Sequence, residues 1–307
     1  VLFRSAEVVK TFGECKAYLN SKKNNQDKII QEYTQGRHFG VEVYGNKSFI
    51  FEISLNNYGI TSPKQSIKLS GGLTKKQEDA LYKIVRKVQE KLKSQGVLQF
   101  DFILSENKWF LIEINPRLSG MTNAVLVSSE KSVFELLWEL SKKSIYAKKN
   151  VSKITEGRKK EVLSLKLPIL KAEILKKIND LKIAEKIYQI ENLEAKQERE
   201  KGFSEIILSG KHIKEIKDKM NLLEKIIKNS ESQETTETKE TTKIQETATN
   251  QETATNQETT ETLRNSENSA SAETIKAFSS AKEQFESMLK HHIQSDCPKK
   301  QFHTKSL

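Results

Sequence analysis

Apolar and polar residues follow strand-like and helix-like patterns in turn along the first part of the chain. Alternation with a period of two predicts strands, and Gly45-Asn46 between two such runs is typical of a β-hairpin. The strands expected on this basis cover residues 7–10, 28–33, 38–44 and 48–53. Thr11 followed by Glu14 has capping-box spacing, so we expect a helix from Thr11 to Leu19. The Asn-, Gly- and Pro-containing stretch Asn56–Gly72 is predicted to be a long loop.

Helical periodicity is clearest from Thr74 to Ser94, and Gly96 is expected to end that helix. Its predicted apolar face comprises Ala80, Leu81, Ile84, Val85, Val88 and Leu92. A second hairpin is expected from Val97–Leu104 and Trp109–Ile114. Another helix is expected over Ser132–Lys142, with Val133, Leu136, Leu137 and Leu140 pointing inward.

A second group of elements follows between residues 155 and 229. Its pattern predicts, in chain order, Val162–Leu167 as a strand, Ala172–Leu181 as a helix, Lys186–Ile190 and Phe203–Leu208 as strands, and Ile213–Ile227 as a helix. We therefore expect an α+β protein whose first domain covers residues 1–150 and whose small α+β subdomain covers residues 151–229.

The composition changes sharply after residue 229. Gln245–Asn250 is repeated at Gln251–Asn256, and such Thr-, Glu- and Gln-rich sequence buries too little apolar area to order a chain. Residues 230–270 are therefore predicted to be a disordered linker. Within residues 271–307, apolar side chains recur at helical spacing, which is compatible with a partner-binding helix over 271–293. We favour the simpler alternative, a transient helix without a partner.

The chain has 307 residues, two cysteines and a formal net charge of +11. No apolar run reaches the roughly 20 residues of a membrane-spanning helix, and the cysteine count suits a reducing cytoplasm. The lysines are scattered among Ile and Glu without interleaved aromatic residues, so we do not expect a nucleic-acid partner. We expect a cytoplasmic protein without a membrane interaction, and formation of a homodimer stays open.

The second expected hairpin carries the candidate chemistry. Apolar side chains alternate with Asp101 on its first strand and with Glu113 and Asn115 on its second. The apolar face of the second strand is expected to be Phe110, Ile112 and Ile114. A three-residue loop, Glu106 to Lys108, would place Asp101 directly across from Glu113.

Two facing carboxylates repel each other unless a proton or a cation lies between them. With the oxygen of Asn115 they form three hard ligands suited to Mg²⁺ or Mn²⁺. Arg117 adds a planar cation for a phosphoryl or carboxylate group. The alternative is that Asp101 and Glu113 are ordinary residues on the wet face of a sheet.

The segment Ile112-Glu-Ile-Asn-Pro-Arg-Leu-Ser-Gly120 resembles the closing motif of the ATP-grasp superfamily, in its carboxylate–amine (amino-acid) ligase and carbamoyl-phosphate-synthetase-like branch. Ile29-Ile-Gln-Glu-Tyr-Thr-Gln-Gly36 resembles the hinge strand of that family, which runs past the adenine. The resemblance covers roughly residues 6–145. It implies that residues 1–150 are the partial ATP-grasp domain, with an antiparallel sheet and helices.

The resemblance also implies roles for single residues. Asp101, Glu113 and Asn115 would hold Mg²⁺ bridging the phosphates of ATP, and Arg117 would steady the γ-phosphate. Four residues at the hinge strand would face the adenine, namely Gln31, Glu32, Tyr33 and Thr34. His38 would lie near the ribose, and Ser119, Gly120 and the Asn56–Gly72 loop would line the acceptor site.

The implied reaction joins a small-molecule carboxylate to an amine through an acyl phosphate, with release of ADP and phosphate. The family's Gly-rich loop and two nucleotide-contacting lysines lie before this region, and none precedes Glu7. We therefore expect an N-terminally truncated fragment that binds nucleotide weakly and turns over little. The alternative function is a non-catalytic nucleotide- and metal-binding module with a partner-binding tail.

Overall fold

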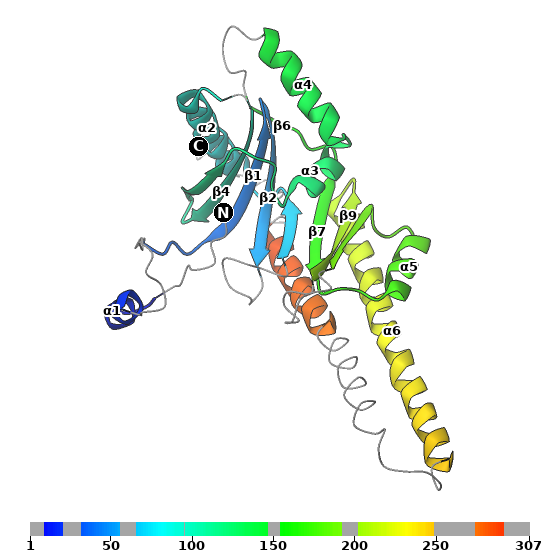
Figure 1. Ribbon diagram of the computed structural model, residues 1–307. Helices are drawn as coiled ribbons and strands as arrows, with labels where there is room; N and C mark the ends of the chain where they lie inside the picture. The colour runs from blue at the N-terminus through cyan, green and yellow to red at the C-terminus, as the bar shows by residue number, and fades with distance from the viewer. Residues whose placement is uncertain are drawn as a thin grey trace, which may run out of the picture.

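The computed structural model describes seven segments of the chain, namely residues 9–20, 32–55, 66–94, 96–146, 154–191, 202–248 and 274–291. Nine strands form one sheet with the order β5-β4-β1-β2-β3-β7-β9-β8, and β6 pairs with β2 (Figure 1). Every neighbouring pair along this order is antiparallel, whereas β6 runs parallel to β2. None of the helices in the described segments is both long and apolar enough to cross a membrane.

The helices and strands have the following bounds in chain order: α1 Phe12–Asn20, β1 Arg37–Tyr44, β2 Lys47–Leu55, β3 Ser66–Ser70, α2 Lys75–Leu92, β4 Val97–Ser105, β5 Lys108–Asn115, α3 Thr122–Ser129, α4 Val133–Tyr146, β6 Thr155–Glu156, β7 Glu161–Leu167, α5 Ala172–Asp180, β8 Lys186–Glu191, β9 Gly202–Gly210 and α6 Ile213–Ala248. The α+β class predicted from the sequence is confirmed. The strands of the second group, β7 to β9, continue the same sheet through the pairing of β7 with β3. The division into domains stays a prediction.

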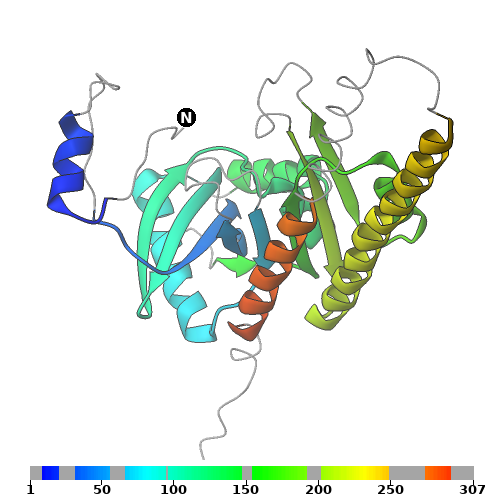
Figure 2. The ribbon, with the colours of Figure 1, turned by 90° about the horizontal axis from the view of Figure 1, so that it is seen from below.

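Helices cover both faces of the sheet (Figure 2). On one face, α2 packs on β1 and β4, and α5 and α6 pack on β7 and β9. On the other face, α3 packs through Met121, Ala124 and Val125 against Phe49 and Phe51 of β2. Candidate site residues lie on this second face, which we call the site face.

Most predicted elements are present with small shifts at their ends. Thr11 accepts a hydrogen bond from the Glu14 N–H at 3.1 Å, so the predicted capping box of α1 is confirmed. Helix α2 ends at Leu92 because Lys93 takes a left-handed conformation, three residues before Gly96. Leu92 was predicted to lie on the apolar face, but its side chain is exposed. In α4, Leu136 is buried as predicted, but Leu137 is 38% exposed.

Two predictions near the N-terminus differ from the structure. Residues 7–8 and 28–31 lie outside the described segments, and the parts of the predicted strands that are described, Val9-Lys10 and Glu32-Tyr33, are not strands. Tyr33 is 63% exposed, so its ring contributes little apolar packing to this segment. Gly36 then brings the chain against β4, since a Cβ atom there would lie 2.5 Å from the carbonyl oxygen of Leu104.

The predicted loop Asn56–Gly72 contains a strand. Residues 56–65 lie outside the described segments, but Ser66–Ser70 forms β3 at the centre of the sheet. Ile67 and Leu69 are fully buried. The alternation Ser-Ile-Lys-Leu-Ser is a period-two pattern, and this signal in the sequence could have identified the strand.

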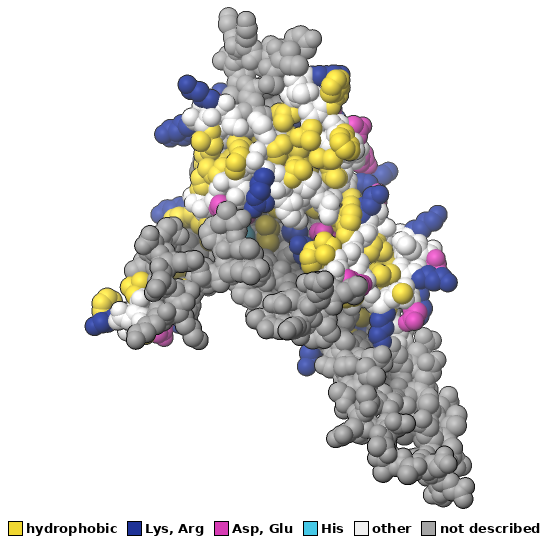
Figure 3. Space-filling view, in the orientation of Figure 1, with side chains coloured by type: hydrophobic (Ala, Val, Ile, Leu, Met, Phe, Trp, Pro, Cys, Tyr) yellow, Lys and Arg dark blue, Asp and Glu magenta, His cyan; other side chains and the backbone are white. Residues whose placement is uncertain are grey.

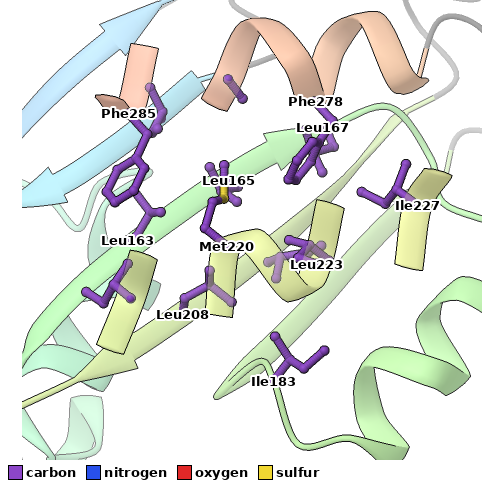
Figure 4. Packing of buried hydrophobic residues seen from close by; sticks show 14 of the residues in the cluster. Leu163, Leu165, Leu167, Ile183, Leu208, Met220, Leu223, Ile227, Phe278 and Phe285 are labelled. Carbon is purple, nitrogen blue, oxygen red and sulfur yellow. The ribbon is translucent and has the colours of Figure 1, made fainter. Parts of the chain in front are cut away.

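The C-terminal region also differs from the prediction. Helix α6 extends to Ala248, into the segment predicted to be disordered, because Glu, Gln, Lys and Ala there are compatible with helix. Residues 274–291 form a further helix, shown in orange in Figure 1. Its apolar face is buried on α6 and β7 of the same chain, with Phe278 and Phe285 pointing into the cluster (Figure 4). A transient, unpacked helix is therefore wrong for residues 274–291.

Candidate functional site

The β4–β5 hairpin is tighter than predicted. Ser105 pairs with Lys108, so the turn has two central residues, Glu106 and Asn107, with φ values of 48° and 63°. Two positive φ values are characteristic of a type I′ turn, whose twist matches that of the strands. The predicted three-residue loop is therefore wrong.

A β-bulge restores the pairing that the loop was expected to produce. From the turn, Leu104 pairs with Trp109 and Phe102 with Leu111, but the register shifts before Asp101. Ile112 is the extra residue of the bulge, so Asp101 pairs with Glu113. The predicted juxtaposition of the two carboxylates is confirmed, although for a different geometric reason.

The bulge also changes which residues of β5 face the core. Trp109 and Ile114 pack on the apolar cluster of β1 and β4, and the Trp109 ring lies 5.8 Å from that of Phe102. Phe110 is 39% and Ile112 is 56% exposed. The predicted apolar face of Phe110, Ile112 and Ile114 is therefore correct only at Ile114, because the bulge reverses the alternation between Leu111 and Glu113.

Three strands bring polar side chains together on the site face. Gly40 of β1 pairs with Asp101 of β4, and Asp101 pairs with Glu113 of β5. His38 lies beside them, with its Nε2 atom 3.3 Å from Oδ1 of Asp101. The structure thus places His38 at the carboxylate pair, a contact that the sequence did not indicate.

Asn115 and Arg117 follow at the end of β5. The amide nitrogen of Asn115 donates to Oε1 of Gln99 at 2.8 Å, which orients its side chain across β4. The backbone N–H of Arg117 donates to the carbonyl of Asn115 at 2.9 Å, so the chain turns there. The guanidinium of Arg117 is exposed, and its Nη1 atom donates to the carbonyl of Leu118 at 3.2 Å.

The ligand set fits a metal ion that is held only partly by protein. Among the described residues, no group of three or more His, Cys, Asp and Glu side chains is arranged to bind a metal. Two neighbouring carboxylates and one amide nevertheless match the usual environment of Mg²⁺, which keeps several waters and takes further oxygens from phosphates. Asp101, Glu113 and Asn115 are the residues that would hold it.

The segment predicted to face adenine lies only partly in the described chain. Gln31 lies outside it. Glu32 and Tyr33 are exposed and Thr34 is half-buried, just before β1 brings His38 to the carboxylates. The adenine-binding role of Gln31, Glu32, Tyr33 and Thr34 stays a prediction.

Sequence reasoning did not identify a buried polar network behind the site. Glu42 is fully buried and accepts hydrogen bonds from Tyr44, Ser119 and Thr122 at 2.6, 2.5 and 3.0 Å, respectively. Burial raises the pKa of Tyr44 above its ordinary value, and the negative charge of Glu42 raises it further. The signal in the sequence is a Glu inside the apolar run Val41-Glu42-Val43 of a predicted strand.

Residues 6–121 match the sequence model of a family described as an ATP-grasp domain. No curated protein matches the chain.

Solved structures give partial matches. The L-amino acid ligase from Bacillus licheniformis has 13% identity and a TM-score of 0.47, and the match covers 62% of this chain and 53% of that one. The N5-carboxyaminoimidazole ribonucleotide synthetase from Thermus thermophilus has 16% identity and a TM-score of 0.45, with 63% and 52% covered. Biotin carboxylase from Campylobacter jejuni has 14% identity and a TM-score of 0.45, with 64% and 46% covered. This chain thus spans about half the length of the structures it matches.

The matched segment contains the elements that build the candidate site. It begins before α1 and ends at Met121, after the β4–β5 hairpin and the Asn115-Pro-Arg117 turn. Residues 6–121, which contain the candidate site, are therefore similar in sequence to an ATP-grasp domain.

Proposed function

We propose that this chain carries the metal-binding part of the site of an ATP- and Mg²⁺-dependent ligase that joins a carboxylate to an amine. The observation that carries the proposal is the pairing of Asp101 with Glu113 next to the Asn115-Pro-Arg117 turn, within the segment that matches the model of an ATP-grasp domain. Two adjacent carboxylates on a half-exposed sheet face are electrostatically unfavourable alone and favourable around a divalent cation.

Each residue of the site has a role in the proposed reaction. Asp101, Glu113 and Asn115 hold Mg²⁺ against the nucleotide, and the bound ion neutralises charge on the phosphates. Arg117 contacts the γ-phosphate, since its exposed planar guanidinium can donate two parallel hydrogen bonds to phosphate oxygens. Gln31, Glu32, Tyr33 and Thr34 contact the adenine. His38, at 3.3 Å from Asp101, contacts the ribose or orients Asp101.

The chemistry needs positioning more than a protein nucleophile. The substrate carboxylate attacks the γ-phosphate of ATP, which gives an acyl phosphate and ADP. The amine then attacks the acyl carbon and phosphate leaves, so a C–N bond replaces the C–O bond to phosphate. The residues of this chain contribute by binding and orienting the nucleotide, as in other phosphoryl transfers.

Nucleotide binding tests the proposal. Isothermal titration of the 307-residue chain with ATP in the presence of Mg²⁺ should show saturable binding that is lost when Mg²⁺ is omitted. Asp101→Asn should weaken this binding at least about tenfold, which is about 1.4 kcal/mol. Glu90→Gln, which removes an exposed carboxylate on α2, is the control and should bind like the wild type. Binding that is absent, or equal in Asp101→Asn, would contradict the proposal.

The second candidate is a nucleotide-binding module without turnover. Release of ADP in the presence of mixed amino acids separates the two candidates. Mg·ATP binding with ADP release that depends on an amino acid supports the ligase, and binding without such release supports the module.

A further inference from the structure

A buried lysine contacts the loop that carries Arg117. Lys68 projects from β3 on the site face and its side chain is 7% exposed. Its Nζ atom donates to the carbonyl oxygen of Gly120 at 3.0 Å. Gly120 lies in residues 116–121, which we call the β5–α3 loop because they connect Asn115 to Thr122.

The charge of Lys68 is balanced from the second part of the sheet. Oε1 of Glu205 on β9 lies 3.6 Å from Nζ, and the Glu205 side chain is 5% exposed. Glu205 also accepts a hydrogen bond from Ser164 of β7 at 2.7 Å and one from Asn123 of α3 at 3.2 Å. Lys68 and Glu205 therefore connect strands β3, β7 and β9 to the end of the β5–α3 loop at Gly120 and to the start of α3 at Asn123.

The β5–α3 loop is held from its other side by Glu42. Ser119 and Thr122 both donate to this carboxylate, and Ser119 also accepts from the N–H of Met121 at 3.0 Å. Glu42 and Lys68 come from different strands, β1 and β3, and together fix the loop two to five residues after Arg117. The loop conformation thus depends on two buried charges of opposite sign.

Stability alone does not explain a lysine at this position. Taking two charges out of water costs several kcal/mol, and well-packed apolar residues often replace buried ion pairs without loss. Lys68 does one thing that an apolar side chain cannot, which is to donate to the carbonyl of Gly120. This hydrogen bond fixes the backbone of the loop at the site that binds nucleotide in the proposed function.

We propose that Lys68 is a positioning residue of the nucleotide site: by its hydrogen bond to Gly120 and its pairing with Glu205, it fixes the β5–α3 loop so that Arg117 faces the phosphates. This inference rests on the proposed function for its ligand, but not for its geometry. It also assigns a role at the site to Glu205, which lies outside the segment that matches the ATP-grasp domain.

Amide hydrogen exchange tests the geometry without any ligand. Lys68→Met alone would leave Glu205 as an unpaired buried charge and could unfold the protein, so the informative variant is Lys68→Met/Glu205→Gln compared with Glu205→Gln. The amides of Arg117, Ser119, Met121 and Thr122 should exchange at least about tenfold faster in the double variant, because a hydrogen bond from a charged group is lost. Lys219→Met is the matched control, since Lys219 donates to the carbonyl of Ser209 away from the site.

Nucleotide affinity then tests the link to Arg117. In the Glu205→Gln background, Lys68→Met and Arg117→Ala should each weaken Mg·ATP binding, and the two together should weaken it no more than Arg117→Ala does. Additive losses, or unchanged exchange in the loop, would overturn the positioning role. If the wild-type chain binds no Mg·ATP, the proposed function fails, while the exchange experiment still decides whether Lys68 orders the loop.

Discussion

Burial gives Lys68 an unusual ionisation behaviour. The pKa of Lys68 is lowered to about 8, chiefly because burial removes the amine from water; the charges of Glu205 and Glu42 partly oppose this effect, and the positive charge of Lys166 adds to it. In the unfolded chain the same amine has an ordinary pKa of about 10.4. Between these two values the unfolded state binds more protons than the folded state, so the free energy of unfolding rises with pH.

The free energy of unfolding should therefore depend on pH through the titration of Lys68. Below about pH 8 both states hold the proton and the contribution is constant. From about pH 8 to about pH 10.5 this lysine should add on the order of 3 kcal/mol to the free energy of unfolding. Urea unfolding measures the increase in the free energy of unfolding from about pH 7.5 to about pH 9.5. This increase should be larger for Glu205→Gln than for Lys68→Met/Glu205→Gln, and it should be the same for Lys219→Met as for the wild type. Equal gains in the two Glu205→Gln backgrounds would show that Lys68 is not desolvated.

Among the elements, helix 274–291 contributes more to the hydrophobic core than its position in the sequence suggests. Phe278, Phe285, Met288 and Leu289 are buried in the cluster formed by α5, α6 and the sheet. An ion pair between Lys282 and Glu224 joins this helix to α6 on the outside. The helix is therefore part of the core, although residues 249–273 separate it from α6 in the chain.

Phe285→Ala should destabilise the protein by about 3–5 kcal/mol, since it removes a fully buried aromatic side chain. The comparison variant is Glu286→Ala, one residue further along the same helix and exposed, which should change the free energy of unfolding by less than about 0.5 kcal/mol. Chemical denaturation followed by circular dichroism measures both. Similar stabilities for the two variants would mean that the helix does not pack on the core in solution.

The sequence was informative about elements and poor about their partners. Periodicity alone located both hairpins, α2, and the helices and strands between residues 162 and 227, because each pattern reflects one local face. It could not place the bulge at Ile112, since the shift depends on how Trp109 and Ile114 pack against β4. It also did not show what covers the apolar face of helix 274–291. Apolar residues at helical spacing look the same whether a helix binds a partner or packs on the core of its own chain.

The same limit applies to the candidate site. Alternation and an assumed three-residue loop placed Asp101, Glu113 and Asn115 together, but the structure achieves this pairing with a two-residue turn and the bulge at Ile112. Glu42 and Lys68 could not be placed in this way, because a charge within a strand acquires its partners only when α3 and β9 pack against it. Figure 3, in the orientation of Figure 1, shows patches of apolar side chains exposed at the surface.

At the scale of the whole molecule, β3 makes one body of the two halves. Ile67 and Leu69 pair with Leu165 and Leu163 of β7, and all four side chains are fully buried. The sheet of the candidate site is thus continuous with the sheet that carries Glu205. Because the shared strand is in the core, opening one half would expose apolar surface of the other, which favours cooperative unfolding.

The position of the two tryptophans allows a direct test of this cooperativity. Both, Trp109 and Trp138, lie before residue 150, so tryptophan fluorescence reports on the first half alone. Ile178→Ala removes a fully buried side chain from α5 in the second half and should cost about 2–5 kcal/mol. If the sheet unfolds as one unit, this substitution lowers the urea midpoint measured by fluorescence as much as the midpoint measured by circular dichroism. A fluorescence midpoint that stays at the wild-type value, while the circular dichroism splits into two transitions, would instead support two independently folding domains that meet at the β3–β7 pairing.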